Sequence, residues 1–117
     1  MCMATDAYVA PRVRDADVTT DFVRDELLRC FESANREFFE ILGRPATEAQ
    51  VREQVHGFVT GVFQQCGASF ENPTKQGILT AIEQCRSNAE QMMGAPGANV
   101  IRHHYSEMMK LVRRLPE

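Results

Sequence analysis

The stretch that decides the fold runs from Asp21 to Leu42 and reads DFVRDELLRCFESANREFFEIL. Its apolar residues recur every three or four positions, at Leu27, Phe31, Ala34, Phe38 and Ile41. Because an α-helix turns about 100° per residue, this spacing places them along one face of a single helix. Thr20 precedes that face as an N-cap, and Gly43 follows it as a stop. We therefore predict an amphipathic helix over this stretch.

Three further segments show the same periodicity. A second helix is predicted to follow a capping box at Thr47–Gln50 and to end at Gly67. A third is predicted to open at Asn72–Pro73, an N-cap with proline in the first helical position, and to end at Gly94. A fourth is predicted over residues 99–115, with Ile101, Tyr105, Met108, Val112 and Leu115 on one face.

The matched helix lengths predict the architecture. Each helix has about 17–22 residues, or roughly 25–33 Å, and connections of about 4–6 residues favour antiparallel neighbours. We predict an all-α protein, a four-helix antiparallel up-down-up-down bundle with an irregular N-terminal tail. The tail covers residues 1–17, which show no sustained period and contain Pro11, and residues 18–117 form the single domain.

Composition narrows the classes of function. A net charge of −3 over 117 residues argues against general binding to nucleic acid or anionic lipid. No apolar run approaches the roughly 20 residues that cross a bilayer, and Met1–Arg14 lacks the apolar core of a signal peptide. We expect a cytoplasmic protein without a membrane partner and without a cofactor.

The cysteines indicate reduced thiols. Cys2 lies in the predicted tail, whereas Cys30, Cys66 and Cys85 lie inside predicted helices, and the chain has no CxxC pair. Cys30, Cys85 and His104 are expected near the middle of the bundle. Zinc binding by these three and simple packing as buried side chains both remain open.

An acidic and histidine set forms a candidate metal or ligand site. Glu53 and His56 have the Glu-x-x-His spacing of carboxylate-bridged di-iron bundles, which need a second copy of the motif. The helical periodicity turns both side chains outward, so a solvated face is expected. Glu37 and Glu40 could add carboxylates from the preceding helix, which keeps a small metal- or nucleotide-binding enzyme as an alternative.

The same set resembles two known families. Glu37-x-x-Glu40 followed by Glu53 is similar to the carboxylate pattern of all-α nucleotide pyrophosphohydrolases, which implies Mg²⁺ binding, although His56 stands where that pattern has aspartate. His56 also resembles the phosphoacceptor of histidine phosphotransfer domains, which implies a four-helix bundle. Those domains carry lysine and glycine where this chain has Val59–Thr60.

Two other surfaces are candidates for partners. Gly57 and Gly61 each cost about 1 kcal/mol inside a helix, so the pair predicts a groove that a helix approaches closely, from this chain or a second subunit. Phe39 and Phe63 flank the core face and widen the apolar surface. A basic patch on the fourth helix comprises Arg102, His103, Lys110, Arg113 and Arg114.

The leading hypothesis is a non-catalytic helical-bundle module for protein interaction or assembly, as a homodimer or with another protein. A nucleic-acid-binding regulator that uses the basic patch is the other alternative.

Overall fold

A computed structural model describes residues 7–116. Within them, the 3₁₀-helix η1 (Asp15–Asp17) is followed by the α-helices α1 (Thr20–Ile41), α2 (Glu48–Gln65) and α3 (Lys75–Val112). No strand forms in this part of the chain, so the predicted all-α class is confirmed. None of these helices combines the length and the apolar character needed to span a bilayer.

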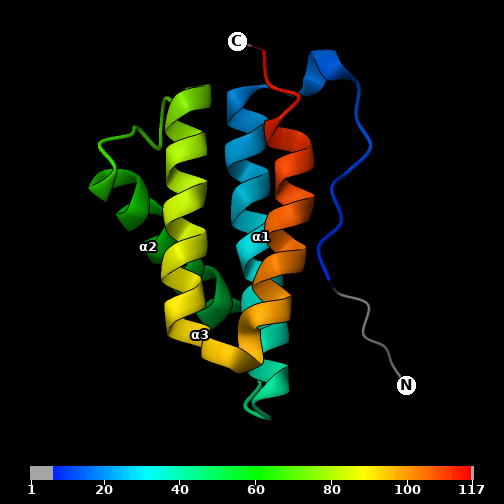
Figure 1. Cartoon of the computed structure of the whole chain (residues 1–117), viewed down its shortest axis with the longest axis vertical. Helices are drawn as coiled ribbons and strands as arrows, with labels where there is room; N and C mark the ends of the chain where they lie inside the picture. The colour runs from blue at the N-terminus through cyan, green and yellow to red at the C-terminus, as the bar shows by residue number, and fades with distance from the viewer. Residues whose placement is uncertain (1–6, 117) are drawn as a thin grey trace.

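The structure has three α-helices in residues 7–116, and the predicted four-helix bundle is therefore not confirmed. The expected loop at residues 94–97 is absent, because helical backbone resumes directly after Gly94, whose φ of 64° and ψ of −157° interrupt α3. Pro96 fits there because a residue in the first turn after a break needs no N–H donor. Figure 1 shows residues 75–93, the first arm, and residues 95–112, the second arm, running in opposite directions.

Three threonines cap the helices. The predicted capping box at Thr47 is present, with Gln50 N–H donating to its Oγ1 at 3.1 Å. Thr19, one residue before the predicted cap, accepts from the Phe22 N–H at 3.1 Å. Thr74 caps α3 in place of Asn72, and its side chain accepts from the Gly77 N–H at 3.0 Å. Helix α3 consequently begins two residues later than the proline predicted.

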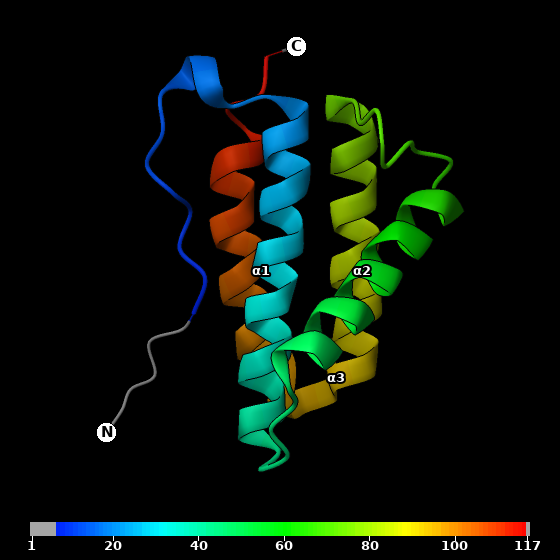
Figure 2. The same cartoon turned by 180° about the vertical axis from the view of Figure 1, so that it is seen from behind.

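The core lies where α1 packs between α2 and both arms of α3 (Figures 1 and 2). Its fully buried side chains include Leu27, Phe63, Ile78, Ile82, Ile101, Met108 and Leu111. The end of α1 extends past the neighbouring helices in both views, so Ile41 is 51% exposed although the sequence predicted a core position. Helix α2 crosses its neighbours obliquely (Figure 2).

Residues 7–17 form a strap along α1 and the second arm of α3 (Figure 1). Tyr8 is buried, and its hydroxyl donates to Oε1 of Glu26 at 2.8 Å. The N–H of Ala10 donates to Oε1 of Glu107 at 3.0 Å, and Arg114 binds a strap carbonyl at 2.6 Å. This part of the predicted tail is therefore docked; residues 1–6 lie outside the described range.

Candidate binding groove

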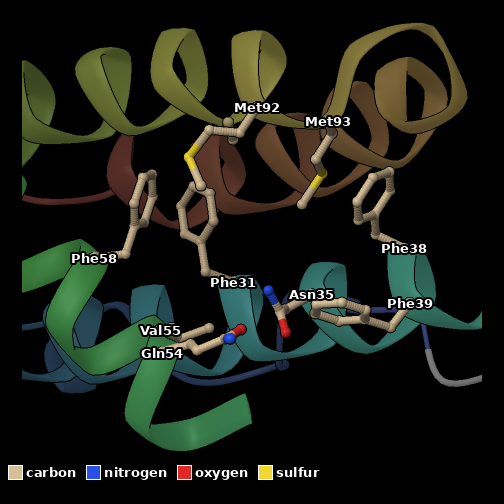
Figure 3. Close-up of a pocket in the computed structure, with 10 residues that line it drawn as sticks. Phe31, Asn35, Phe38, Phe39, Gln54, Val55, Phe58, Met92 and Met93 are labelled. Atoms are coloured by element: carbon tan, nitrogen blue, oxygen red, sulfur yellow. The ribbon is translucent and has the colours of Figure 1, made fainter. Parts of the chain in front are cut away.

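An apolar groove of about 500 Å³ opens between α1, α2 and the first arm of α3 (Figure 3). Its lining consists of Phe31, Asn35, Phe38, Phe39, Gln54, Val55, Phe58, Ala89, Met92 and Met93. None of these side chains is charged. Phe31, Val55 and Ala89 are buried and form the floor, whereas Gln54 and Met92 are exposed at the mouth. We call this feature the aromatic groove.

The groove exists because three apolar faces meet without closing. Phe31 on α1 and Phe58 on α2 contact each other as tilted rings, with centroids 5.8 Å apart. The methionine side chains of the first arm lie across the opening from this contact (Figure 3). Met92 is 74% exposed, which is unusual for a large apolar side chain that lines a cavity. The site therefore combines a rigid aromatic floor with flexible thioethers.

Asn35 is the main polar feature of the groove. Its Oδ1 atom is shielded from solvent and has no hydrogen-bond partner among the described residues. An unsatisfied buried acceptor costs about 1–3 kcal/mol, so such an atom calls for an explanation. Phe31, Phe38 and Phe39, which share the groove with it, have no side-chain donor. Figure 3 shows the amide among these rings.

The predicted interaction residues have different surroundings. Phe39 lines the aromatic groove, whereas Phe63 is only 1% exposed and packs edge-on against Phe70 in the core. A Cβ atom on Gly57 or Gly61 would meet nothing within 4 Å, so no helix of the described chain packs against this pair. The prediction that another helix of this chain approaches the pair is therefore wrong for the described residues, whereas approach by a second subunit and simple tolerance of glycine at an exposed site both stay predictions.

The acidic and histidine set remains dispersed. Glu53 and His56 are exposed, as the periodicity predicted, and they line a shallow depression that does not include Glu37 or Glu40. In the described part of the chain, no three histidine, cysteine or acidic side chains are grouped to hold a metal ion. His56 instead lies edge-on to the ring of Phe70, at 5.8 Å between centroids.

Cys30, Cys85 and His104 are all buried, as predicted. Burial raises the pKa of Cys85 to about 12 and raises the pKa of Cys30, so neither thiol is a ready nucleophile. Cys30 donates to the backbone oxygen of His104 at 3.4 Å rather than to the ring. Cys66 is also a free thiol, and Cys2 lies outside the described residues.

The imidazole of His104 is saturated with hydrogen bonds. Nδ1 lies 2.7 Å from the carbonyl oxygen of Val100, which can only accept, so Nδ1 carries the proton. Nε2 then accepts from the Ser33 hydroxyl at 3.1 Å and from the Tyr8 N–H at 3.4 Å. This histidine therefore holds the strap onto the bundle.

Much of the basic patch is engaged within the chain. Arg114 pairs with Asp15 of the strap at 2.7 Å, and Lys110 pairs with Glu107 at 2.6 Å. Nε2 of His103 lies 3.0 Å from a strap backbone oxygen, and Arg102 donates to an asparagine on its own helix. Arg113 is exposed. These contacts give the patch a structural role in holding residues 7–17.

No protein family model matches this chain, and the comparisons with curated proteins and with solved structures found no match. The function must therefore be argued from the groove itself. The sequence predicted Phe39 at a partner surface but not the groove, because the groove forms only where three helices pack together. The adjacent pairs Phe38–Phe39 and Met92–Met93 were the available signal, since they widen the apolar faces of their helices.

Proposed function

We propose that this protein is a non-catalytic helical-bundle module that acts by binding, with the aromatic groove as its binding site. The observation that carries the proposal is a large cavity lined by aromatic and methionine side chains. Binding sites are typically concave and mostly apolar, with a few polar groups that fix orientation. A binding role also fits the raised thiol pKa values and the saturated ring of His104.

We further propose that the module assembles as a homodimer around the mouth of this groove. Ile41 and Leu42 at the end of α1 are 51% and 40% exposed, and Met92 at the mouth is 74% exposed. Large apolar side chains in this number favour burial against another surface. In a two-fold dimer, each copy presents the same patch to the other, so the apolar residues of each copy cover those of its partner. The three free thiols fit a reducing compartment, and we place the protein in the cytoplasm.

Sedimentation velocity of the full chain at micromolar concentrations tests the assembly. We expect a dimer for the wild type and a monomer for Ile41→Asp, because a buried unpaired carboxylate opposes association. Val9→Asp is the matched control, since Val9 is 69% exposed on the strap, outside the groove lining. A wild-type monomer across the range, or equal loss of the dimer in both variants, would count against the proposed interface.

A further inference from the structure

We propose that the strap carries an acid-sensitive latch at Tyr8: protonation of His104 detaches Tyr8 from the bundle, while the helices and the rest of the strap stay in place. The latch consists of Tyr8, Ser33, His103 and His104, and none of these residues lines the aromatic groove. The latch is therefore independent of the proposed binding site, and it adds a conformational change to the module.

Two neighbouring histidines of the second arm hold the main chain of Tyr8 through different groups. Nε2 of His104 accepts from the Tyr8 N–H at 3.4 Å. Nε2 of His103 lies 3.0 Å from the Tyr8 carbonyl oxygen, to which a ring nitrogen can only donate. The buried Tyr8 side chain adds the hydrogen bond from its hydroxyl to Glu26. Of these three contacts, only the one to His104 requires a neutral imidazole.

Protonation of His104 affects the two partners of its Nε2 atom differently. Nδ1 already carries a proton, because the Val100 carbonyl oxygen 2.7 Å away can only accept. A second proton therefore binds Nε2 and turns this acceptor into a donor. The Ser33 hydroxyl, at 3.1 Å, can rotate and accept from it. The Tyr8 N–H is only a donor, so two donors then face each other and Tyr8 is the group that must move.

The charged and titratable groups around the ring decide how readily it takes up the proton. They are Cys30 and Glu37 on α1, Arg86 on the first arm, His103 and Glu107 on the second arm, and Tyr8 on the strap. Burial lowers the pKa of His104 most and His103 adds to this, while the two carboxylates oppose it. Release of Tyr8 exposes more of the ring to water and removes part of this burial. By proton linkage, a fall in pH therefore favours the released state.

The other contacts of the strap do not depend on a neutral histidine. Ala10 N–H donates to Glu107, and hydrogen bonds from Lys110 and from Ala10 itself hold the pKa of this carboxyl below its usual value. Glu107 is therefore still an acceptor in mild acid. Arg114 stays charged and donates to the Val13 carbonyl oxygen at 2.6 Å. Release is consequently confined to the Tyr8 end of the strap.

Hydrogen exchange of backbone amides in the full-length protein, followed by NMR from pH 7.5 to pH 5, tests the latch. At each pH, the exchange rate of the Tyr8 N–H is divided into that of an unstructured peptide to give its protection. One proton changes the opening equilibrium by at most about tenfold per pH unit. We expect the protection of Tyr8 to fall about fivefold between pH 7 and pH 5.5. The Val18 N–H, which donates to the Asp15 oxygen at 3.1 Å, should keep its protection.

The chain has three histidines, so replacing each in turn assigns the sensor. His104→Gln should abolish the pH dependence at Tyr8, because the glutamine oxygen can accept from the Tyr8 N–H but does not titrate. His103→Gln should keep the fall, because its amide can still donate to the Tyr8 carbonyl oxygen. His56→Gln is the control on α2 and should behave like the wild type, since His56 lies against Phe70.

A wild-type measurement covers the case in which His104→Gln does not fold, which circular dichroism would show. NMR titration of the His104 ring should then follow the same pH curve as the loss of protection at Tyr8. Three results would overturn the latch: constant protection of Tyr8 down to pH 5.5, an equal loss at Val18, or a fall that persists in His104→Gln. Sedimentation as a monomer would reject the homodimer and leave the latch intact.

Discussion

The stability of the bundle should fall in mild acid because of His104. Burial lowers the pKa of this histidine, and His103 adds to the effect, while the carboxylates of Glu37 and Glu107 oppose it. The Nε2 atom accepts two hydrogen bonds, from Ser33 and from the strap at Tyr8, and a protonated ring can accept neither. The native state therefore favours the neutral ring.

The sign and size of the effect follow from proton linkage. A histidine whose folded pKa is below its unfolded value of about 6.5 contributes stability above that pH. This stability is lost as the pH falls below about 6.5, because His104 is protonated in the unfolded chain but stays neutral in the native state. One proton corresponds to a slope of at most about 1.4 kcal/mol per pH unit. We expect the free energy of unfolding to approach that slope between pH 6.5 and the folded pKa.

Urea unfolding followed by circular dichroism, at several pH values from 7.5 to 5, measures this slope. His104→Gln removes the titrating group, so the slope of the wild type minus that of the variant isolates its contribution. His56→Gln is the control, because His56 is exposed on α2 and lies against Phe70 rather than against His104 or the strap. Parallel pH profiles for the wild type and His104→Gln, or stability that rises as the pH falls, would refute this reasoning.

Two further changes test the turn in α3 and the strap. Gly94→Ala should destabilise the protein by about 1–2 kcal/mol, because its φ of 64° is left-handed and disfavours a Cβ atom. Gly57→Ala should instead stabilise it by about 0.5–1 kcal/mol, because Gly57 is helical with open space around it. Equal effects at the two glycines, measured by thermal or urea unfolding, would contradict this assignment. Tyr8→Phe should lower the free energy of unfolding by about 1–2 kcal/mol in the same assay, because the buried carboxylate of Glu26 loses a hydrogen-bond donor. An unchanged unfolding midpoint would show that the strap contributes little to stability.

Local signals in the sequence predicted the helices well and their connections less well. The capping box at Thr47 depends only on neighbouring residues, and it forms as predicted. Gly94 and Pro96 were interpreted as part of a loop. In the structure only Gly94 leaves the helical backbone, since proline is tolerated in the first turn of the arm that follows. The distinction between one interrupted helix and two separate ones lies in a single residue, which periodicity does not resolve.

The site was less predictable because it depends on how the helices pack. The spacing of Phe31 and Phe38 on α1 predicts an apolar face, but not whether another helix covers it. The groove depends on how α1, α2 and the first arm of α3 pack, and this packing arises from contacts between segments that are distant in the sequence. The strap shows no period, because main-chain groups and side chains far along the sequence hold it, as His104 holds Tyr8. Neither feature has a local signature.

The strap also has a consequence for the order in which the protein can fold during synthesis. Tyr8 and the ring of His104, which accepts its N–H, are separated by 96 positions in the sequence. A ribosome adds about 5–20 residues per second, so roughly 5–20 seconds separate the synthesis of Tyr8 from that of His104. Until then the carboxylate of Glu26 and the hydroxyl of Tyr8 can pair, but the surface that α1 and the second arm form together for the strap does not yet exist. Closing this long loop is a late event, and the incomplete chain presents apolar surface that chaperones recognise in the meantime.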